Sequence, residues 1–497
     1  MVRRNGELVE TSWADALAFV ADRLRGARGD LGALVAPLTS NEEGHLLGRL
    51  LRGIGSDHID HRLRTLDFSD APAAAPFAMP VAAIEKATAI LLVGCNPRHE
   101  VPLLNHRIRK AARAGAKIYA INPLDFEFNF DLAGRIVAAP QAFLDAVIGM
   151  ASGSGEAPTQ GWIKALGDAS ASVVILGETA LNHPAAARLR TAARTIATST
   201  NSACNEIPGG ANAIGLARAG VTPRSGGHDA AAMLAAPPKH LIVYHAGSQD
   251  TSAPAAFDRA RTDAAFCVYI GAYACNGVRR TAHAVLPIGL PPEIDGSYTN
   301  LDGVVQVLAG AAKPPGDARP GWKVLRALGS ALSLPGFGFT EIAEVRAQMG
   351  ETAKVETGED APLHPLGRLP AAFADESLVG APEGVMPSES EKGIAASAAP
   401  TRLMRITTTA IYSSDAVVRR SPALQAHPLA RKACVTLHPQ DALALGLGSG
   451  AKARVCGVEL AVEVSMRVPR GGAWIEAGHA ATKTLPPYGA ALDIVKA

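Results

Sequence analysis

Clustered cysteines are missing from this 497-residue sequence. Its six cysteines are spread along the chain and no two of them form a CxxC pair, whereas closed iron–sulfur and zinc sites need several close ligands. So few cysteines in so long a chain are no disulfide scaffold, which favours a reducing compartment. His58 with His61, and His99 with His106, are spaced to share a helical face, but neither pair has a third ligand nearby in sequence. We therefore expect no metal site.

Long apolar runs and an excess of one charge are missing as well. The longest charge-free apolar runs, such as residues 87–95, fall well short of the roughly 18 residues needed to cross a bilayer. The two arginines near the N-terminus are not followed by an apolar stretch, so no secretory signal is predicted. The net charge is only +2, which gives no reason to expect nucleic acid as the main partner. We expect a soluble chain with no nucleic-acid partner and no direct membrane insertion.

The standard catalytic and nucleotide-binding motifs are also absent. The sequence has no GxGxxG, no GxxxxGK[ST], no GxSxG and no HExxH. Neither a dinucleotide fingerprint, a P-loop, a nucleophile elbow nor a zinc-protease helix is therefore supported. We predict no catalytic residue from these patterns.

What the sequence does contain is a repeated alternation of apolar strands and amphipathic helices. Residues 88–94 form a continuous apolar run, residues 100–114 have helical spacing of apolar side chains, and residues 117–121 form a second apolar run. Continuous apolar strands alternating with helices are typical of a parallel sheet that is covered on both faces. The pattern recurs at strand 172–177 with a helix near 184–196, and at strand 240–246, helix 254–263 and strand 266–270. This predicts an α/β fold of doubly wound parallel-sheet domains.

Three later stretches break this alternation. Residues 294–308 carry Asp-Gly turn signals between β-prone runs and predict a loop and hairpin. Residues 351–400 contain six prolines, and nine acidic against three basic residues, which predicts a linker. Short strands between Gly-rich turns then predict a small β-rich C-terminal domain. The predicted division is an N-terminal helical and α/β segment (1–80), an α/β core (81–350), an acidic Pro-rich linker (351–400) and a β-barrel-like domain (401–497).

Two loops follow strands of the predicted sheet at the edge where open α/β sheets bind ligands. Gly94, Asn96 and Arg98 come after the strand at 88–94, and Asn122 comes after the strand at 117–121. Glycine allows a ligand to approach the backbone, asparagine both donates and accepts hydrogen bonds, and arginine suits a phosphate. Ordinary turn chemistry with a surface arginine explains the same residues. Local sequence leaves both interpretations open.

Residues 91–100 (LLVGCNPRHE), with Pro102, Asn105 and the arginines at 107 and 109, resemble a segment of the molybdopterin oxidoreductases. Three further stretches resemble the same family in the same order along the chain. They are residues 12–17 (SWADAL), residues 283–306, which contain AVLP and GSYTNLDG, and residues 437–447 (LHPQDALALGL). The resemblance implies the doubly wound domains of that family, followed by its C-terminal β-barrel.

The departures from the enzymes of this family are informative. In its cysteine-dependent members a cysteine ligates the metal in a stretch that is similar to residues 60–70, and here Leu66 stands at that place. A leucine side chain has no lone pair to donate to molybdenum. The enzymes' Asp-Pro-Arg is replaced by Asn122-Pro123-Leu124, and the N-terminal four-cysteine module is absent. The resemblance thus implies a relic pocket of Gly94, Asn96, Arg98, Asn122 and Leu66 that holds no cofactor.

Residues 59–70 (IDHRLRTLDFSD) resemble a non-enzymatic branch, the large iron–sulfur subunit of bacterial NADH:quinone oxidoreductase (complex I). This implies a scaffold without cofactor in this chain, with the iron–sulfur clusters in N-terminal domains that the chain lacks. It also implies other subunits of the peripheral arm as partners, on the cytoplasmic side of the inner membrane. The complex would pass electrons from NADH to quinone and translocate protons. Residues 2–8 resemble the junction after the cluster domains, so a fragment, a split gene and a late start codon are all open.

Two alternative functions remain at this point. The chain could be a catalytic fragment of a molybdopterin-dependent oxidoreductase, because some members use an oxygen ligand and Asp67 is adjacent to Leu66. It could also be a nucleotide-binding α/β protein that uses the loop of Asn96 and Arg98 alone. The resemblance favours the scaffold over both.

Overall fold

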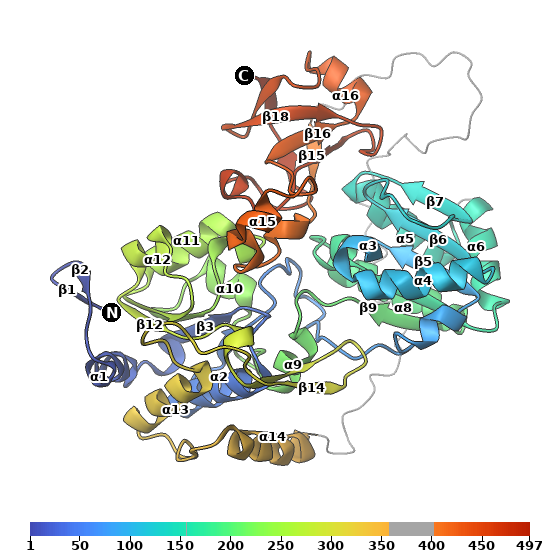
Figure 1. The fold of residues 1–497 in the computed structure, drawn as a ribbon. Coiled ribbons are helices and arrows are strands. Elements are labelled where there is room, and N and C mark those ends of the chain that lie inside the picture. The colour runs from blue at the N-terminus through green and yellow to red at the C-terminus, as the bar shows by residue number, and fades with distance from the viewer. Residues whose placement is uncertain (156, 357–401) are drawn as a thin grey trace.

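A computed structural model describes residues 1–155, 157–356 and 402–497. These residues build three large sheets, two of them flanked by helices, and a separate two-stranded hairpin (Figure 1). Within the described ranges, no helix is both long enough and apolar enough to span a bilayer.

The first sheet combines the N-terminal residues with a segment more than 200 residues later. Its strand order is β2-β1-β12-β11-β10-β3-β4, and β3, β4, β10, β11 and β12 pair in parallel. The bounds are β1 (Val2–Arg4), β2 (Glu7–Val9), β3 (Leu31–Val35), β4 (His58–Asp60), β10 (His240–Tyr244), β11 (Phe266–Gly271) and β12 (Ala284–Pro287). Strands from both sides of the predicted boundary at residue 80 therefore belong to one sheet, since β3 pairs with β10.

Helices cover both faces of this sheet, as expected for a doubly wound domain. One apolar core lies under α1 (Trp13–Leu24), α2 (Asn41–Ile54) and α13 (Gly321–Ala331). The other lies under α10 (Ala230–Ala235), α11 (Pro254–Asp263) and α12 (Asn276–Thr281). The helix α2 begins with a capping box between Ser40 and Glu43 and ends at Gly55 in the left-handed region, so local sequence signals set both of its ends.

The second sheet is fully parallel, in the order β7-β6-β5-β8-β9. Its strands are β5 (Ala89–Val93), β6 (Lys117–Asn122), β7 (Gly134–Val137), β8 (Ser172–Leu176) and β9 (Ala203–Glu206). The helices α5 (Pro140–Ser152), α6 (Ala157–Gly167) and α8 (Ala186–Ser199) cover one face, and α4 (Pro102–Arg113) covers the other. The helix predicted over 100–114 is interrupted at Val101, because the following Pro102 disfavours helical backbone there; α3 (Pro97–Glu100) precedes it.

The third sheet forms the C-terminal part, in the order β20-β15-β19-β16-β18-β17-β21 around its own core. Its elements are β15 (Leu403–Ile406), α15 (Pro422–Gln425), β16 (Cys434–Leu437), α16 (Pro439–Ala444), β17 (Lys452–Val455), β18 (Val458–Val464), β19 (Gly472–Trp474), β20 (Ala491–Leu492) and β21 (Ile494–Lys496). The predicted fold class, doubly wound α/β followed by a β-rich and nearly barrel-like domain, is confirmed.

The remaining elements connect these sheets. The predicted hairpin is present as β13 (Gly296–Thr299) and β14 (Val305–Leu308), which pair antiparallel. The others are α7 (Glu178–Leu181), α9 (Ala213–Arg218) and α14 (Ile342–Glu356). Most of the predicted linker 351–400 lies outside the described residues, and its first six residues extend α14. The four-part domain division therefore stays a prediction.

Candidate functional site

The two predicted loops lie side by side at the carboxyl edge of the second sheet. The Gly94 amide donates to the Ile121 carbonyl at 2.8 Å, and the Cys95 amide donates to the Asn122 side-chain oxygen at 2.8 Å. Gly94 has φ +57° and packs directly against α7. Asn96 is 7% exposed and its Oδ1 atom has no hydrogen-bond partner. The structure thus brings Gly94, Asn96 and Asn122 together, as their positions after parallel strands predict.

Arg98 does not join this group. Its side chain is 45% exposed and pairs at 3.4 Å with Glu127, which is exposed as well. Arg98 is the second residue of α3, and its partner Glu127 belongs to the segment that follows β6. Arg98 therefore lies at the surface, and its role in a cofactor pocket stays a prediction.

Leu66 lies at a different place, beside a small cavity where the two α/β parts meet the C-terminal part. We call this the Leu66 cavity; its volume is about 40 Å³. Of the five predicted pocket residues, Leu66 alone lines it. The side chains around it come from all three parts of the chain and include Arg64, Glu178, Gln249, Arg405, Thr409, His479 and Tyr488.

Apolar side chains close off the space next to the Leu66 cavity. Leu66 packs against a cluster that contains Leu124, Phe126, Ile406 and Tyr488. Leu124, the residue that replaces the arginine of the enzymes, is 1% exposed. Burying a leucine stabilises a fold by about 1.5–3 kcal/mol, so both leucines favour a closed junction between the α/β parts and the C-terminal part.

Charged side chains at the Leu66 cavity are engaged largely with the protein itself. The Glu178 carboxylate accepts hydrogen bonds from the Thr409 amide at 3.0 Å and from the Thr409 hydroxyl. Arg405 donates to the Pro486 carbonyl, and burial lowers its pKa to about 10. Arg405 Nε, Tyr488 Oη and His479 Nε2 have no hydrogen-bond partner. A 40 Å³ space with such atoms has room for one or two bridging water molecules.

Glu100 links the predicted loops to the Leu66 cavity. Its carboxyl accepts from the Asn96 amide at 2.5 Å and from the Glu178 amide at 2.8 Å. Burial raises the pKa of Glu100 to about 8, and the nearby Glu178 carboxylate raises it as well. Glu100 is therefore protonated near neutral pH, so no second negative charge lies beside Glu178. Its two hydrogen bonds hold the loop after β5 against α7. No spacing or motif in the sequence singled out either glutamate.

Asp67, the candidate oxygen ligand, points away from the Leu66 cavity. One carboxylate oxygen accepts from the amide and hydroxyl of Ser69, and the other accepts from the Ala187 amide at 2.8 Å. Burial raises the pKa of Asp67, but these hydrogen bonds outweigh it and leave the pKa below its ordinary value. The buried Arg190 donates from Nε and Nη2 to the two carboxylate oxygens of Asp70. The segment 67–70 is therefore anchored to α8 rather than free to coordinate a metal.

A molybdenum-bound pterin nucleotide does not fit these residues. Leu66 supplies no donor atom, Asp67 is engaged elsewhere, and the 40 Å³ of the Leu66 cavity compares with roughly 300–1,000 Å³ for ligand pockets. In the described part of the chain, no group of three or more His, Cys, Asp or Glu side chains is arranged to hold a metal ion.

His183 lies between the second sheet and the C-terminal part, in edge contact with Tyr488 at 5.3 Å between ring centroids. Its Nδ1 accepts from the Ala185 amide at 3.0 Å and its Nε2 lies 3.2 Å from the Pro140 carbonyl, which is the pattern of a neutral ring. Burial lowers the pKa of His183 to about 4. The unfolded chain therefore binds a proton below pH 6.5 that the folded chain rejects, so stability falls as pH drops from about 6.5 to about 4.

We expect His183→Asn to flatten this acid response. The difference between a pKa of 6.5 and one of about 4 corresponds to a loss of about 3 kcal/mol at pH 4. Urea unfolding of wild type and variant at a series of pH values between about 7 and about 4 measures it. His106→Asn is the matched control, because His106 is exposed. Parallel stability curves for wild type and His183→Asn would contradict the assignment.

Comparisons with known proteins agree with this architecture. The family model described as molybdopterin oxidoreductase matches residues 1–331. The chain is 28% identical over 379 residues to the mitochondrial NADH-ubiquinone oxidoreductase 78 kDa subunit of Neurospora crassa, covering 72% of this chain and 47% of that protein. It is 28% identical over 360 residues to the mitochondrial NADH dehydrogenase [ubiquinone] iron-sulfur protein 1 of Solanum tuberosum, covering 70% and 45%.

The chain thus spans about half the length of the curated relatives it matches. Among solved structures, acetylene hydratase from Pelobacter acetylenicus superposes with a TM-score of 0.59 at 12% identity, covering 98% of this chain and 90% of that one. At this identity the likeness is one of fold.

Proposed function

The chain belongs to the molybdopterin oxidoreductase family, and we propose that it is the cofactor-free scaffold part of the large iron–sulfur subunit of a respiratory NADH:quinone oxidoreductase. The observation that carries this proposal is the similarity to complex I subunits over about 70% of the chain. In the proposed assembly, iron–sulfur clusters held outside this chain carry electrons from NADH toward quinone. The chain contributes binding surfaces for other subunits of the peripheral arm.

The Leu66 cavity supports the cofactor-free part of the proposal. Leu66 and Leu124 share one apolar cluster at the place where the resemblance puts the ligand and the arginine of the enzymes. A charged cofactor in that space would lose its hydration without full pairing. In this proposal the chain acts as a scaffold that presents binding surfaces for other subunits in a fixed arrangement.

The hairpin β13–β14 supports a binding role. Its inner strand is held by α2, since the Ser297 amide donates to Glu42 at 2.8 Å. Its outer strand is exposed and apolar, with Val305 54% and Val307 67% exposed. Exposed clusters of apolar side chains on a rigid element mark protein–protein contacts, and the proposal assigns this one to a neighbouring subunit of the complex.

We expect the double substitution Val305→Lys and Val307→Lys to abolish co-purification of a tagged chain with other complex subunits from its own cells. Two lysines in an apolar contact lose hydration without gaining partners. The melting temperature of the purified chain should stay unchanged, because both side chains are exposed. Leu443→Lys, at a side chain that is 79% exposed in the C-terminal part, is the matched control and should leave co-purification intact.

Elemental analysis of the same purified protein distinguishes the proposed scaffold function from that of a catalytic molybdopterin enzyme. The scaffold predicts no stoichiometric molybdenum or tungsten in wild type or in Leu66→Cys, because a single thiolate does not open the Leu66 cavity. Stoichiometric molybdenum or tungsten in wild type, or wild-type purification without any complex subunit, would overturn the proposal.

A further inference from the structure

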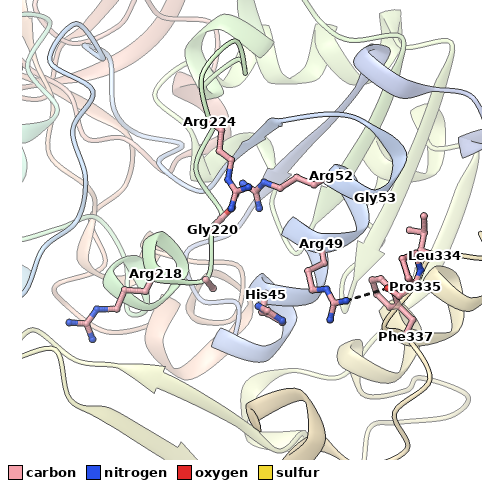
Figure 2. Close-up of a pocket in the computed structure, with 11 residues that line it drawn as sticks. His45, Arg49, Arg52, Gly53, Arg218, Gly220, Arg224, Leu334, Pro335 and Phe337 are labelled. Atoms are coloured by element: carbon pink, nitrogen blue, oxygen red, sulfur yellow. Dashed lines mark hydrogen bonds between the residues drawn. The ribbon is translucent and has the colours of Figure 1, made fainter. Parts of the chain in front are cut away.

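A second cavity, of about 330 Å³, lies beside the first sheet and shares no lining residue with the Leu66 cavity. We call it the basic cavity. Figure 2 shows the residues around it, which come from α2, from the end of α9 and the segment that follows it, and from the segment after α13. Its polar lining consists of His45, Arg49, Arg52, Arg218 and Arg224, and its apolar lining includes Leu334 and Phe337.

Basic side chains make up most of the polar lining of the basic cavity, and one of them, Arg52, is paired with Asp57 at 2.9 Å. Four arginines line the cavity, and no lining residue of the described chain is an aspartate or a glutamate. Arg49 donates to the Gln348 side chain at 2.5 Å and to the Pro335 carbonyl at 3.2 Å, and Arg218 donates to the Gly303 carbonyl at 2.8 Å. These partners are uncharged, so the positive charges of Arg49 and Arg218 are not neutralised by them.

Two glycines leave room for the Arg52 side chain at the basic cavity. Arg52 donates to Asp57 at 2.9 Å and to the Gly220 carbonyl at 2.8 Å. A Cβ atom at Gly48 would lie 2.7 Å from the Arg52 Nη1 atom, and one at Gly220, where φ is +80°, would lie 3.0 Å from it. Gly48 and Gly220 thus make room for the Arg52 guanidinium. Gly48 lies within α2, where glycine lowers helix stability by about 1 kcal/mol relative to alanine.

His45 gives a second, independent indication of a ligand. The side chain is 5% exposed and its Nε2 atom has no hydrogen-bond partner, which is rare for a buried polar atom. Burial lowers the pKa of His45 to about 4, with further contributions from Arg49 and Arg52. The ring is therefore neutral near neutral pH, and an anion beside Arg49 would bring a negative charge to this lining and offer His45 a partner.

We infer that the basic cavity binds a small phosphate-bearing anion. Guanidinium groups match phosphate oxygens with paired, charge-assisted hydrogen bonds, and several arginines around one space are typical of phosphate recognition. The volume of about 330 Å³ falls at the lower end of the range for small-molecule sites. Phe337 and Leu334 supply an apolar wall for the uncharged part of a nucleoside phosphate, whereas inorganic pyrophosphate satisfies the arginines alone.

Isothermal titration of the full chain with ADP and with inorganic pyrophosphate, at physiological salt, tests this inference. We expect both ligands to bind, and Arg49→Gln and Arg218→Gln each to weaken binding by about 10-fold or more, the loss of one charge-assisted contact. Arg98→Gln is the matched control, because Arg98 is a half-exposed arginine on the other α/β sheet. Tighter binding of ADP than of pyrophosphate identifies a nucleoside phosphate, and equal binding identifies the phosphate group alone.

Three results would overturn the inference. The first is the absence of binding by either ligand at millimolar concentration. The second is a loss of binding in Arg98→Gln that equals the loss in Arg218→Gln. The third is equal binding of a tetraglutamate peptide, which would identify an acidic protein segment as the occupant. Melting temperatures without ligand show whether each variant is folded, and Arg218→Gln, which gives up a hydrogen bond to a backbone carbonyl, guards against failure of Arg49→Gln to fold.

Discussion

Replacing Gly94 by alanine is expected to destabilise the chain by about 2–5 kcal/mol, or to prevent it from folding, for two reasons that add. Gly94 has φ +57°, and left-handed backbone costs a residue with a Cβ atom about 1–2 kcal/mol. The added Cβ atom would also lie 2.4 Å from the backbone nitrogen of Ala180 and 2.7 Å from its Cβ atom. Relieving that contact requires β5 and α7 to separate, and overpacking of this kind costs about 1–3 kcal/mol more. Urea unfolding followed by circular dichroism measures the loss.

Gly115→Ala is the matched control for this experiment. Gly115 also has positive φ, at +96°, but a Cβ atom there would meet nothing within 4 Å. Its substitution therefore reports the backbone cost alone. If Gly94→Ala were no more destabilising than Gly115→Ala, the close approach of β5 to α7 would be wrong.

Replacing Asp250 by alanine is expected to cost about 3–5 kcal/mol, because it leaves a buried guanidinium without its partner. Asp250 and Arg419 lie 2.6 Å apart with side chains 9% and 8% exposed, and they join the first α/β part to the segment before β16. Asp250 also accepts from the Gly247 amide at 2.8 Å, a contact that the substitution removes as well. The unfolding midpoint in urea, with the slope unchanged, measures this loss.

The double variant Asp250→Asn with Arg419→Gln tests whether the unpaired buried charge of Arg419 causes the loss of stability. Neutral partners leave no buried charge unpaired, so the double variant should be more stable than Asp250→Ala alone. Glu459→Ala, in the exposed pair with Lys452, should leave the midpoint unchanged. A loss in Asp250→Ala no larger than that in Glu459→Ala would show that the pair does not hold the two parts together.

Several strands and helices of the two α/β sheets could be predicted because their signals are local. The strand expected at 88–94 is β5 and the strand expected at 172–177 is β8, and every residue of both is buried. The break at Val101 is likewise a local effect of Pro102. The close approach of the loop after β5 to Asn122, seen in the hydrogen bond from the Cys95 amide, is expected from their places after neighbouring parallel strands.

The residues around the Leu66 cavity could be predicted only in part. The sequence resemblance drew attention to Leu66 and Leu124, which meet in one apolar cluster. Glu178, Arg405 and Tyr488 come from distant segments of the chain, and no spacing rule connects them. The exposed position of Arg98 could not be predicted, because a loop after a strand does not specify the direction of the side chains that follow it.

The sequence by itself determined the local alternation of buried strands and amphipathic helices, and the resemblance to one family. These depend on side chains within about one turn or one strand of each other. Only the tertiary structure decided that β3 pairs with β10 in one sheet, with Leu31 opposite His240. It likewise decided that His45, Arg49 and Arg218 surround one cavity. The apolar pattern of a segment indicates which of its side chains are buried. It does not indicate which distant segment packs against them, because that depends on the tertiary fold.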